Sequence, residues 1–96
     1  MVIESADVPT AQGGKYMQQL LKHWSHKLET SLDGASGSVR FADALARFDA
    51  GPKSLTVTLE AETAEVLARM KTVLATHLDR FAFREAPLKF DWKVAA

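Results

Sequence analysis

Hydrophobic and polar residues alternate along several short segments of this chain. The clearest segment is 55–60, where Leu55, Val57 and Leu59 occupy alternate positions with threonines between them. Strict alternation is typical of a β-strand with one buried face, because successive side chains of a strand point to opposite sides. Four further segments alternate in the same way and are predicted as strands: 2–8, 39–41, 44–50 and 88–92.

Two longer segments repeat hydrophobic residues every three or four positions, which is the period of an α-helix. The first follows Pro9, and the residues on its apolar face are Met17, Leu20, Leu21, Trp24 and Leu28. We expect this helix to end near Leu32, with Gly34 as its left-handed C-terminal residue. The second helix is predicted over residues 62–81, and its apolar face consists of Val66, Met70, Val73, Leu74, His77 and Phe81.

The order of the predicted elements is β-α-β-β-β-α-β within a single α+β domain, residues 1–96. One apolar face per helix and alternating strands fit a mainly antiparallel sheet with two helices on one face, so the sequence predicts a two-layer sandwich. The other face of the sheet is expected to be polar, with Thr56, Thr58, Lys89, Asp91 and Lys93. We therefore expect a monomer or a weak dimer that forms through a strand edge.

Charge and composition narrow the classes of function. The chain has 12 basic and 12 acidic residues and no net charge. Because nucleic acids and anionic membranes are bound by clustered Lys and Arg, we expect no nucleic acid and no membrane as a partner. The absence of cysteine excludes disulfides and thiolate metal sites. With no signal-peptide pattern at the start, we expect a soluble cytoplasmic protein that binds a small ligand or a partner protein.

His23 and His26 stand three positions apart on the first predicted helix, close enough to share a metal ion. They are the candidate metal ligands, although a third ligand would have to come from another segment. Both lie outside the apolar face, so the alternative is a solvated helix surface. We predict that both are accessible to solvent.

His77 stands on the apolar face of the second predicted helix. A buried imidazole needs hydrogen-bond partners, so we predict that His77 is largely buried and hydrogen-bonded. Its role is then structural, or it belongs to a site in which it converges with His23 from the first helix.

The segments YMQQLLKHWSHK (16–27) and HLDRFAFRE (77–85) resemble a bacterial family catalogued as domain of unknown function 2218. The likeness extends from ADVPT (6–10) to KFDW (89–92). The motif residues that it implies are Tyr16, Gln18, Gln19, Lys22, His23, His26, His77, Arg80, Phe81, Phe83, Arg84 and Glu85. The resemblance implies no reaction, but family members are often encountered near genes of siderophore uptake and reduction. Leu21 stands where many relatives have cysteine, which argues against a function that depends on a thiol.

The leading hypothesis is a non-enzymatic binding or accessory module, linked to iron or siderophore metabolism. Its candidate ligand-binding residues are Tyr16, His23, His26, His77 and Arg84. One alternative is a small enzyme that uses His23 or His77 as an acid–base group, with its site between the first helix and the FAFRE segment. The other alternative is a histidine-based metal-binding protein. No cofactor is predicted, and a metal ion at the histidines is the only candidate.

Overall fold

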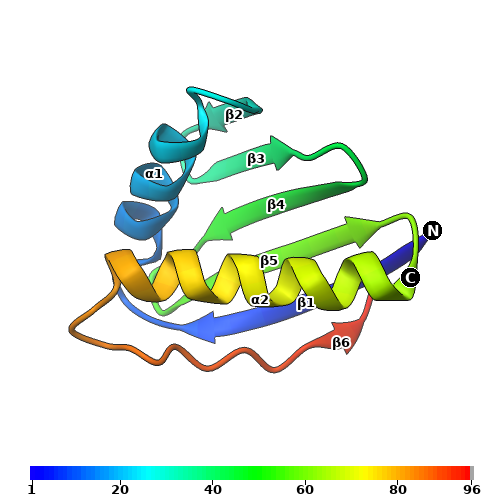
Figure 1. Ribbon diagram of the computed structural model, residues 1–96. Helices are drawn as coiled ribbons and strands as arrows, with labels where there is room; N and C mark the ends of the chain where they lie inside the picture. Colours follow the sequence, from blue (N-terminus) through cyan, green and yellow to red (C-terminus); the bar gives the residue numbers. More distant parts are fainter. Residues whose placement is uncertain (96) are drawn as a thin grey trace.

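The computed structural model describes residues 1–95, which form a six-stranded sheet and two helices (Figure 1). All neighbouring strands are antiparallel, and they stand in the order β2-β3-β4-β5-β1-β6. The strands are β1 (Val2–Pro9), β2 (Glu29–Asp33), β3 (Ser36–Arg40), β4 (Ala44–Ala50), β5 (Ser54–Ala61) and β6 (Lys93–Val94). Four of the six strands, β2 to β5, therefore form a meander, and β1 pairs with β5 at its end.

The helices α1 (Gly13–Trp24) and α2 (Ala64–Phe81) pack on the same face of the sheet (Figure 1). α1 lies over β2, β3 and β4, while α2 lies mainly over β5, and the two helices also contact each other. Where α1 approaches β3, a Cβ on Gly37 would collide with the tip of the Leu21 side chain, which would have to shift. The predicted α+β sandwich with both helices on one face is confirmed.

The first helix is shorter than predicted. It ends at Trp24, and residues that we assigned to its last turns form β2, which pairs with β3. Ser25 follows the helix and donates its hydroxyl proton to the Lys22 carbonyl oxygen, a local bond that competes with continued helix. Gly34 does adopt a positive φ of 62°, but in the hairpin turn between β2 and β3. One strand more than predicted therefore lies between the helices.

The last strand also differs from the prediction. Residues 88–92 are extended but do not pair with the sheet, and β6 contains only the next two residues, opposite Glu4 and Ser5 of β1. The alternation itself is confirmed, since Leu88 is buried and Phe90 and Trp92 are half-buried against the core. The apolar side chains of this segment are thus anchored by packing, without a hydrogen-bond ladder.

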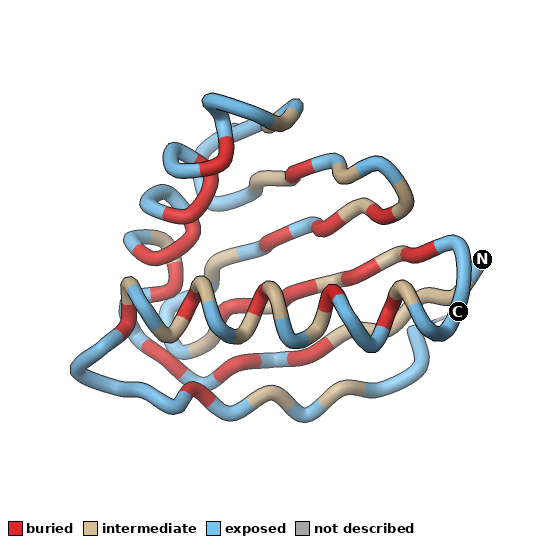
Figure 2. Tube along the Cα trace, viewed as in Figure 1, coloured by how far each residue is buried: buried red, intermediate tan, exposed pale blue. Residues whose placement is uncertain are grey.

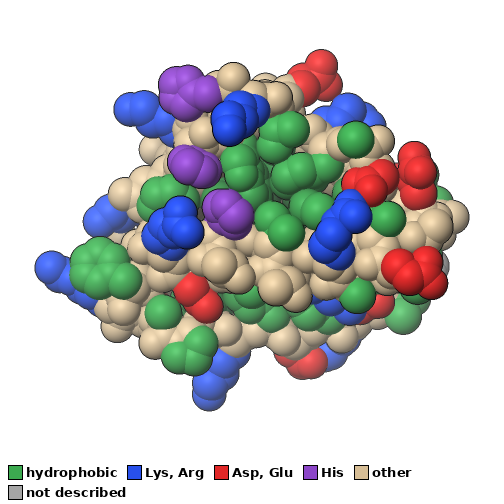
Figure 3. All heavy atoms as spheres, viewed as in Figure 1, with side chains coloured by type: hydrophobic (Ala, Val, Ile, Leu, Met, Phe, Trp, Pro, Cys, Tyr) green, Lys and Arg blue, Asp and Glu red, His purple; other side chains and the backbone are tan. Residues whose placement is uncertain are grey.

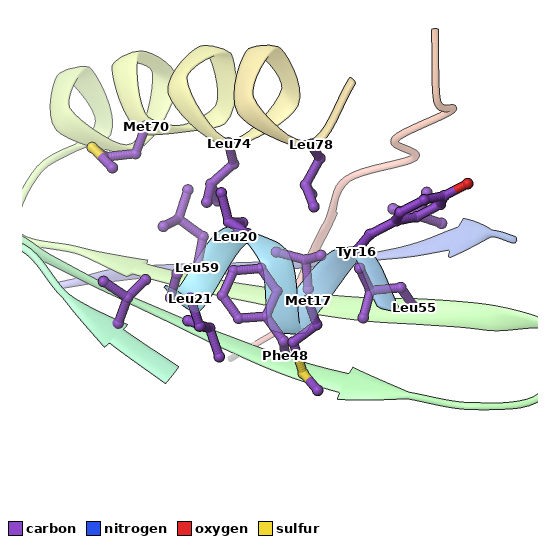
Figure 4. Close-up of a cluster of buried hydrophobic side chains, with 14 of the residues drawn as sticks. Tyr16, Met17, Leu20, Leu21, Phe48, Leu55, Leu59, Met70, Leu74 and Leu78 are labelled. Carbon is purple, nitrogen blue, oxygen red and sulfur yellow. The ribbon is translucent and has the colours of Figure 1, made fainter. Parts of the chain in front are cut away.

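A single hydrophobic core fills the space between the helices and the sheet. Buried positions alternate along the strands and recur along the sheet-facing side of each helix (Figure 2). Leu20 of α1 and Leu74 of α2 lie above Phe48 of β4 in the middle of this cluster, and all three are fully buried (Figure 4). Burial of such large apolar side chains is the main stabilising contribution to a domain of this size.

The buried face of α2 is displaced from the predicted one. Its buried residues are Leu67, Met70, Leu74 and Leu78, while Val66, Val73, His77 and Phe81 are half-buried. His77 therefore lies at the margin of the buried face and not near its centre. This displacement brings His77 towards α1, which makes it part of the candidate site described below.

The sheet face opposite the helices is polar, as predicted, but Lys89 and Asp91 do not belong to a strand of it, because residues 88–92 do not pair with the sheet. The Thr56 hydroxyl donates to Asp7 over 2.6 Å, and Arg47 pairs with Glu60 at 3.3 Å. Hydroxyl and charged side chains that bond to one another in this way can meet water directly, so this face needs no covering layer. Over residues 1–95, no helix has the length and apolar character needed to cross a membrane.

Candidate functional site

Five aromatic rings form a continuous row across the junction of α1 and α2, which we call the aromatic row. It consists of Phe41, Trp24, His77, His23 and Phe81. Successive ring centroids are separated by 5.1, 5.0, 5.9 and 6.1 Å in that order. These spacings lie within the range of favourable aromatic contacts. The row begins at the loop between β3 and β4 and ends at the last residue of α2.

His77 lies in the middle of the row and is fixed by its own helix. Its Nδ1 atom lies 2.7 Å from the carbonyl oxygen of Val73. Because a carbonyl oxygen only accepts hydrogen bonds, Nδ1 carries the proton, and Nε2 of the neutral ring keeps its lone pair. The predicted hydrogen bond is confirmed, but the prediction of a largely buried ring is wrong, because His77 is half-buried. An imidazole oriented in this manner presents a base or a metal ligand.

His23 converges with His77 from the facing helix, which is the arrangement considered from the sequence. Their ring centroids are 5.9 Å apart and their planes are tilted by 45°. His23 and His26 are both exposed, so the prediction of solvent-accessible side chains is confirmed. His26, however, makes no ring contact with the other described residues and stands outside the row. The pair formed in space is therefore His23 with His77, not His23 with His26.

Tyr16 belongs to a second group at the other end of α1. Its ring is 6% exposed and lies at the edge of the core, while its hydroxyl points away from the cluster and donates to Glu85 (Figure 4). Glu85 also accepts a 3.0 Å hydrogen bond from Thr10. The bond to Glu85, burial of the ring and the Glu85 charge raise the pKa of Tyr16, and nearby Arg84 partly opposes them. This group fastens the segment after α2 to the start of α1.

The five candidate residues from the sequence therefore do not form one cluster. His23 and His77 share the aromatic row, Tyr16 and Arg84 lie near Glu85, and His26 stands apart. Arg84 is exposed, and its guanidinium lies 5.8 Å from the centre of the Phe83 ring.

Sequence reasoning missed the other rings of the row. Trp24 and Phe41 read as ordinary apolar positions, and Phe81 was named as a motif residue without a role. Only the placement of the loop that carries Phe41 beside α1 brings the three rings into one row, in which Trp24 is buried. The position of Trp24 directly after His23 was the one signal of the row in the sequence. Glu85 was named as a motif residue, but without a role.

The histidines do not form a complete metal centre on their own. In the part of the chain that the structure describes, no group of three or more His, Asp or Glu side chains is placed to hold an ion. A structural zinc site normally has four protein ligands. His23 and His77 therefore offer two ligands at most, and any further ligand has to come from outside these residues.

The surroundings of the row combine apolar and basic side chains. Figure 3 shows hydrophobic side chains between the helices, with histidines beside them and Lys and Arg side chains adjacent to the histidines. Lys22 precedes His23 in the last turn of α1, and Arg80 follows His77 by three positions in the last turn of α2. Residues three apart on a helix are surface neighbours, so Arg80 places a positive charge next to His77. The surface around the row thus combines apolar rings with positive charge.

Comparison with known proteins shows to which family the chain belongs. A family model described as "Uncharacterized protein conserved in bacteria (DUF2218)" matches residues 5–93. The chain belongs to the DUF2218 family. The resemblance inferred from the Tyr16–Lys27 and His77–Glu85 segments is confirmed, and both segments carry residues of the site. No curated protein matches the chain.

A solved relative supports the fold of this DUF2218 protein. The NMR structure of PA4090 from Pseudomonas aeruginosa is 31% identical in sequence, with a TM-score of 0.82. The similarity covers 97% of this chain and 96% of that one. The whole architecture, including the junction of α1 and α2, is thus similar to that of an experimentally solved protein.

Proposed function

We propose that this DUF2218 protein is a non-enzymatic binding module whose ligand is a flat, anionic aromatic molecule held on the aromatic row. The carrying observation is the unbroken contact from Phe41 through Trp24 and His77 to His23 and Phe81. Flat rings stack favourably on such side chains, each contact contributing about 0.5–1.5 kcal/mol. The adjacent Lys and Arg side chains would offset a negative charge on the ligand.

The polar atoms of the row would orient the ligand. Nε2 of His77 can accept a hydrogen bond from a phenolic or amide group, because Nδ1 is already committed to Val73. Binding sites typically combine an apolar surface with a few polar groups placed in this manner. The proposed setting is the cytoplasm, and the siderophore-related gene context of the family suggests that the module serves iron metabolism. The use of His23 or His77 in acid–base chemistry stays a prediction.

The proposal can be tested by NMR titration with quinoline-5-sulfonate, a flat aromatic anion. We expect chemical-shift changes at the indole N–H of Trp24 and at the rings of His23 and His77. The chain has two tryptophans, and Trp92 packs against Phe90 outside the row, so its indole N–H is an internal control. Comparable shifts at both indoles would indicate unspecific binding and contradict the proposal.

Two phenylalanine variants provide a matched comparison. Phe41 and Phe90 are both half-buried against the core, but only Phe41 belongs to the row. Phe41→Ala should weaken binding by roughly 2- to 12-fold, the equivalent of one aromatic contact of about 0.5–1.5 kcal/mol. Phe90→Ala should leave the affinity unchanged. Equal effects of the two substitutions would place the ligand elsewhere.

A further inference from the structure

His23 and His77 are two metal-ligating side chains of the candidate site, and they come from different helices. A metal–imidazole bond is about 2.0–2.1 Å long, so two imidazoles on one ion have ring centroids roughly 4.5–6.3 Å apart. The observed separation of 5.9 Å lies in this range. The distance between the two rings is therefore compatible with a shared ion.

The hydrogen bond of His77 orients its ring as in histidines that bind metal ions. Imidazoles that bind metals usually donate their other ring nitrogen to a backbone carbonyl or a carboxylate, which fixes the tautomer and the ring orientation. The Nδ1 atom of His77 has this bond to Val73. His23 is exposed, so its side chain has room to turn towards the same ion.

Two protein ligands leave at least two coordination positions open. Over residues 1–95, no third His, Asp or Glu completes the set, so the remaining ligands must come from the bound molecule or from water. Lys22 and Arg80 would repel a bare cation but not an ion that is already held by an anionic chelator. The aromatic row beside the histidines would stack on the ring of such a chelator.

We infer that His23 and His77 bind a borderline transition-metal ion such as Zn²⁺, Ni²⁺ or Cu²⁺ when it arrives in complex with an anionic aromatic chelator. The inference rests on the proposed function, because it gives the flat ligand a metal ion. Neutral imidazole is a preferred ligand of these ions. The chelator supplies the other ligands and the ring, and the protein supplies two nitrogens, the aromatic row and positive charge.

Calorimetric titration can distinguish the contributions of the metal ion and of the aromatic anion to the binding affinity. The probe is the 1:1 complex of Zn²⁺ with 8-hydroxyquinoline-5-sulfonate. The control ligand, quinoline-5-sulfonate, has the same ring system and sulfonate but lacks the chelating hydroxyl, and Zn²⁺ alone is the third arm. We expect the complex to bind at least tenfold more tightly than either quinoline-5-sulfonate or Zn²⁺ alone.

Histidine variants test which side chains hold the ion. His23→Ala and His77→Ala should each weaken binding of the complex by roughly tenfold or more, since loss of even a second-shell partner costs about 10–100-fold in metal affinity. His26→Ala removes a histidine from the same region of the chain, outside the row, and should change the affinity by less than about threefold. His23 is exposed, so its variant gives a result even if His77→Ala folds poorly.

The outcomes distinguish this inference from the proposed function. Wild-type affinity of the complex for both the His23→Ala and the His77→Ala variants would overturn the inference, as would an equal loss in His26→Ala. If quinoline-5-sulfonate binds to the aromatic row and the metal adds nothing, the proposed function stands and the metal inference falls. If neither the complex nor quinoline-5-sulfonate binds, both fall.

Discussion

Tyr16 shows how a single side chain can connect the core with a polar contact. Its ring packs with the buried leucines of α1 and β5, and its hydroxyl donates to Glu85 beyond the end of α2 (Figure 4). The hydrogen bond stabilises the protonated phenol, and burial disfavours the phenolate, so both raise the pKa of Tyr16. The folded protein thus holds this group in its neutral form.

Titration of Tyr16 can be measured without interference, because it is the only tyrosine of the chain. We expect the tyrosinate absorbance of the native protein to appear with a midpoint above 10, and that of the urea-unfolded protein near the ordinary value of about 10. Glu85→Gln should lower the native pKa, since it removes the negative charge. Arg84→Ala should raise it further. A native midpoint at the unfolded value would contradict this assignment.

The same group gives a pH dependence of stability whose sign follows from the direction of the shift. Below pH about 10, Tyr16 is neutral in both the folded and unfolded states, and its contribution is complete. As the pH rises through the raised pKa, the unfolded state gains more from deprotonation, and this contribution is lost. The urea midpoint of Tyr16→Phe should therefore fall less steeply above pH 10 than that of the wild type.

At the scale of single residues, the sequence predicted which side chains are exposed to solvent but not which side chains contact each other. The helical period correctly placed His23 and His26 in solvent, because one helix determines which of its own residues face away from the core. It placed His77 too deep, because the buried face of α2 includes Leu67 and Leu78 beside the predicted Met70 and Leu74. The contact between His77 and His23 depends on how two helices cross, and no local pattern encodes that crossing.

At the scale of elements, the contact between α1 and α2 depends on the same rings. Trp24 is 8% exposed, and its ring lies 5.0 Å from that of His77, which in turn lies beside His23. The hydrogen bond of His77 stays within α2 and does not link the helices. Loss of the His77 ring should therefore remove aromatic packing between the helices without leaving a buried donor unsatisfied.

The comparison of His77→Ala with His26→Ala tests this contact. His77→Ala should lower the free energy of unfolding by about 0.5–1.5 kcal/mol, the worth of an aromatic pair. His26→Ala should change it by no more than about 0.5 kcal/mol, as is usual for an exposed position without contacts. Both values can be taken from urea denaturation curves at pH 7.5. Equal losses would mean that His77 does not join the two helices.

The β2–β3 hairpin shows why one element was missed in the sequence. Gly34 signals a left-handed residue, and such a residue is required both at a helix C-terminus and in a tight hairpin turn. The following Ala35 has no positive φ, so a single glycine suffices in this turn. The loop consists of Gly34 and Ala35, and glycine at the first position of a two-residue loop is the signal of a type II′ hairpin turn. Helical periodicity that extended to Leu28 obscured it.

At the scale of the whole molecule, the sheet ends in two different edges. One edge is β6, which pairs over only two residues, and the other is β2, whose outer side is unpaired in the described chain. An unpaired strand is a template for association with a second copy. In the antiparallel register that pairs the full length of β2 with itself, Glu29 of one copy faces Asp33 of the other. Like charges directly opposite each other destabilise such a pair.

We therefore expect the protein to be monomeric at low ionic strength, with the two carboxylates of β2 acting against dimerisation. Light scattering over a dilution series should give the mass of one chain at micromolar concentration. Replacing Glu29 and Asp33 together by threonine should promote dimers, because threonine favours strands and removes the repulsion. Salt should shift the wild type in the same direction, because the Debye length falls to about 3 Å at 1 M. A wild-type dimer that persists on dilution at low salt, or a double variant that stays monomeric at millimolar concentration, would show that these charges do not control the edge.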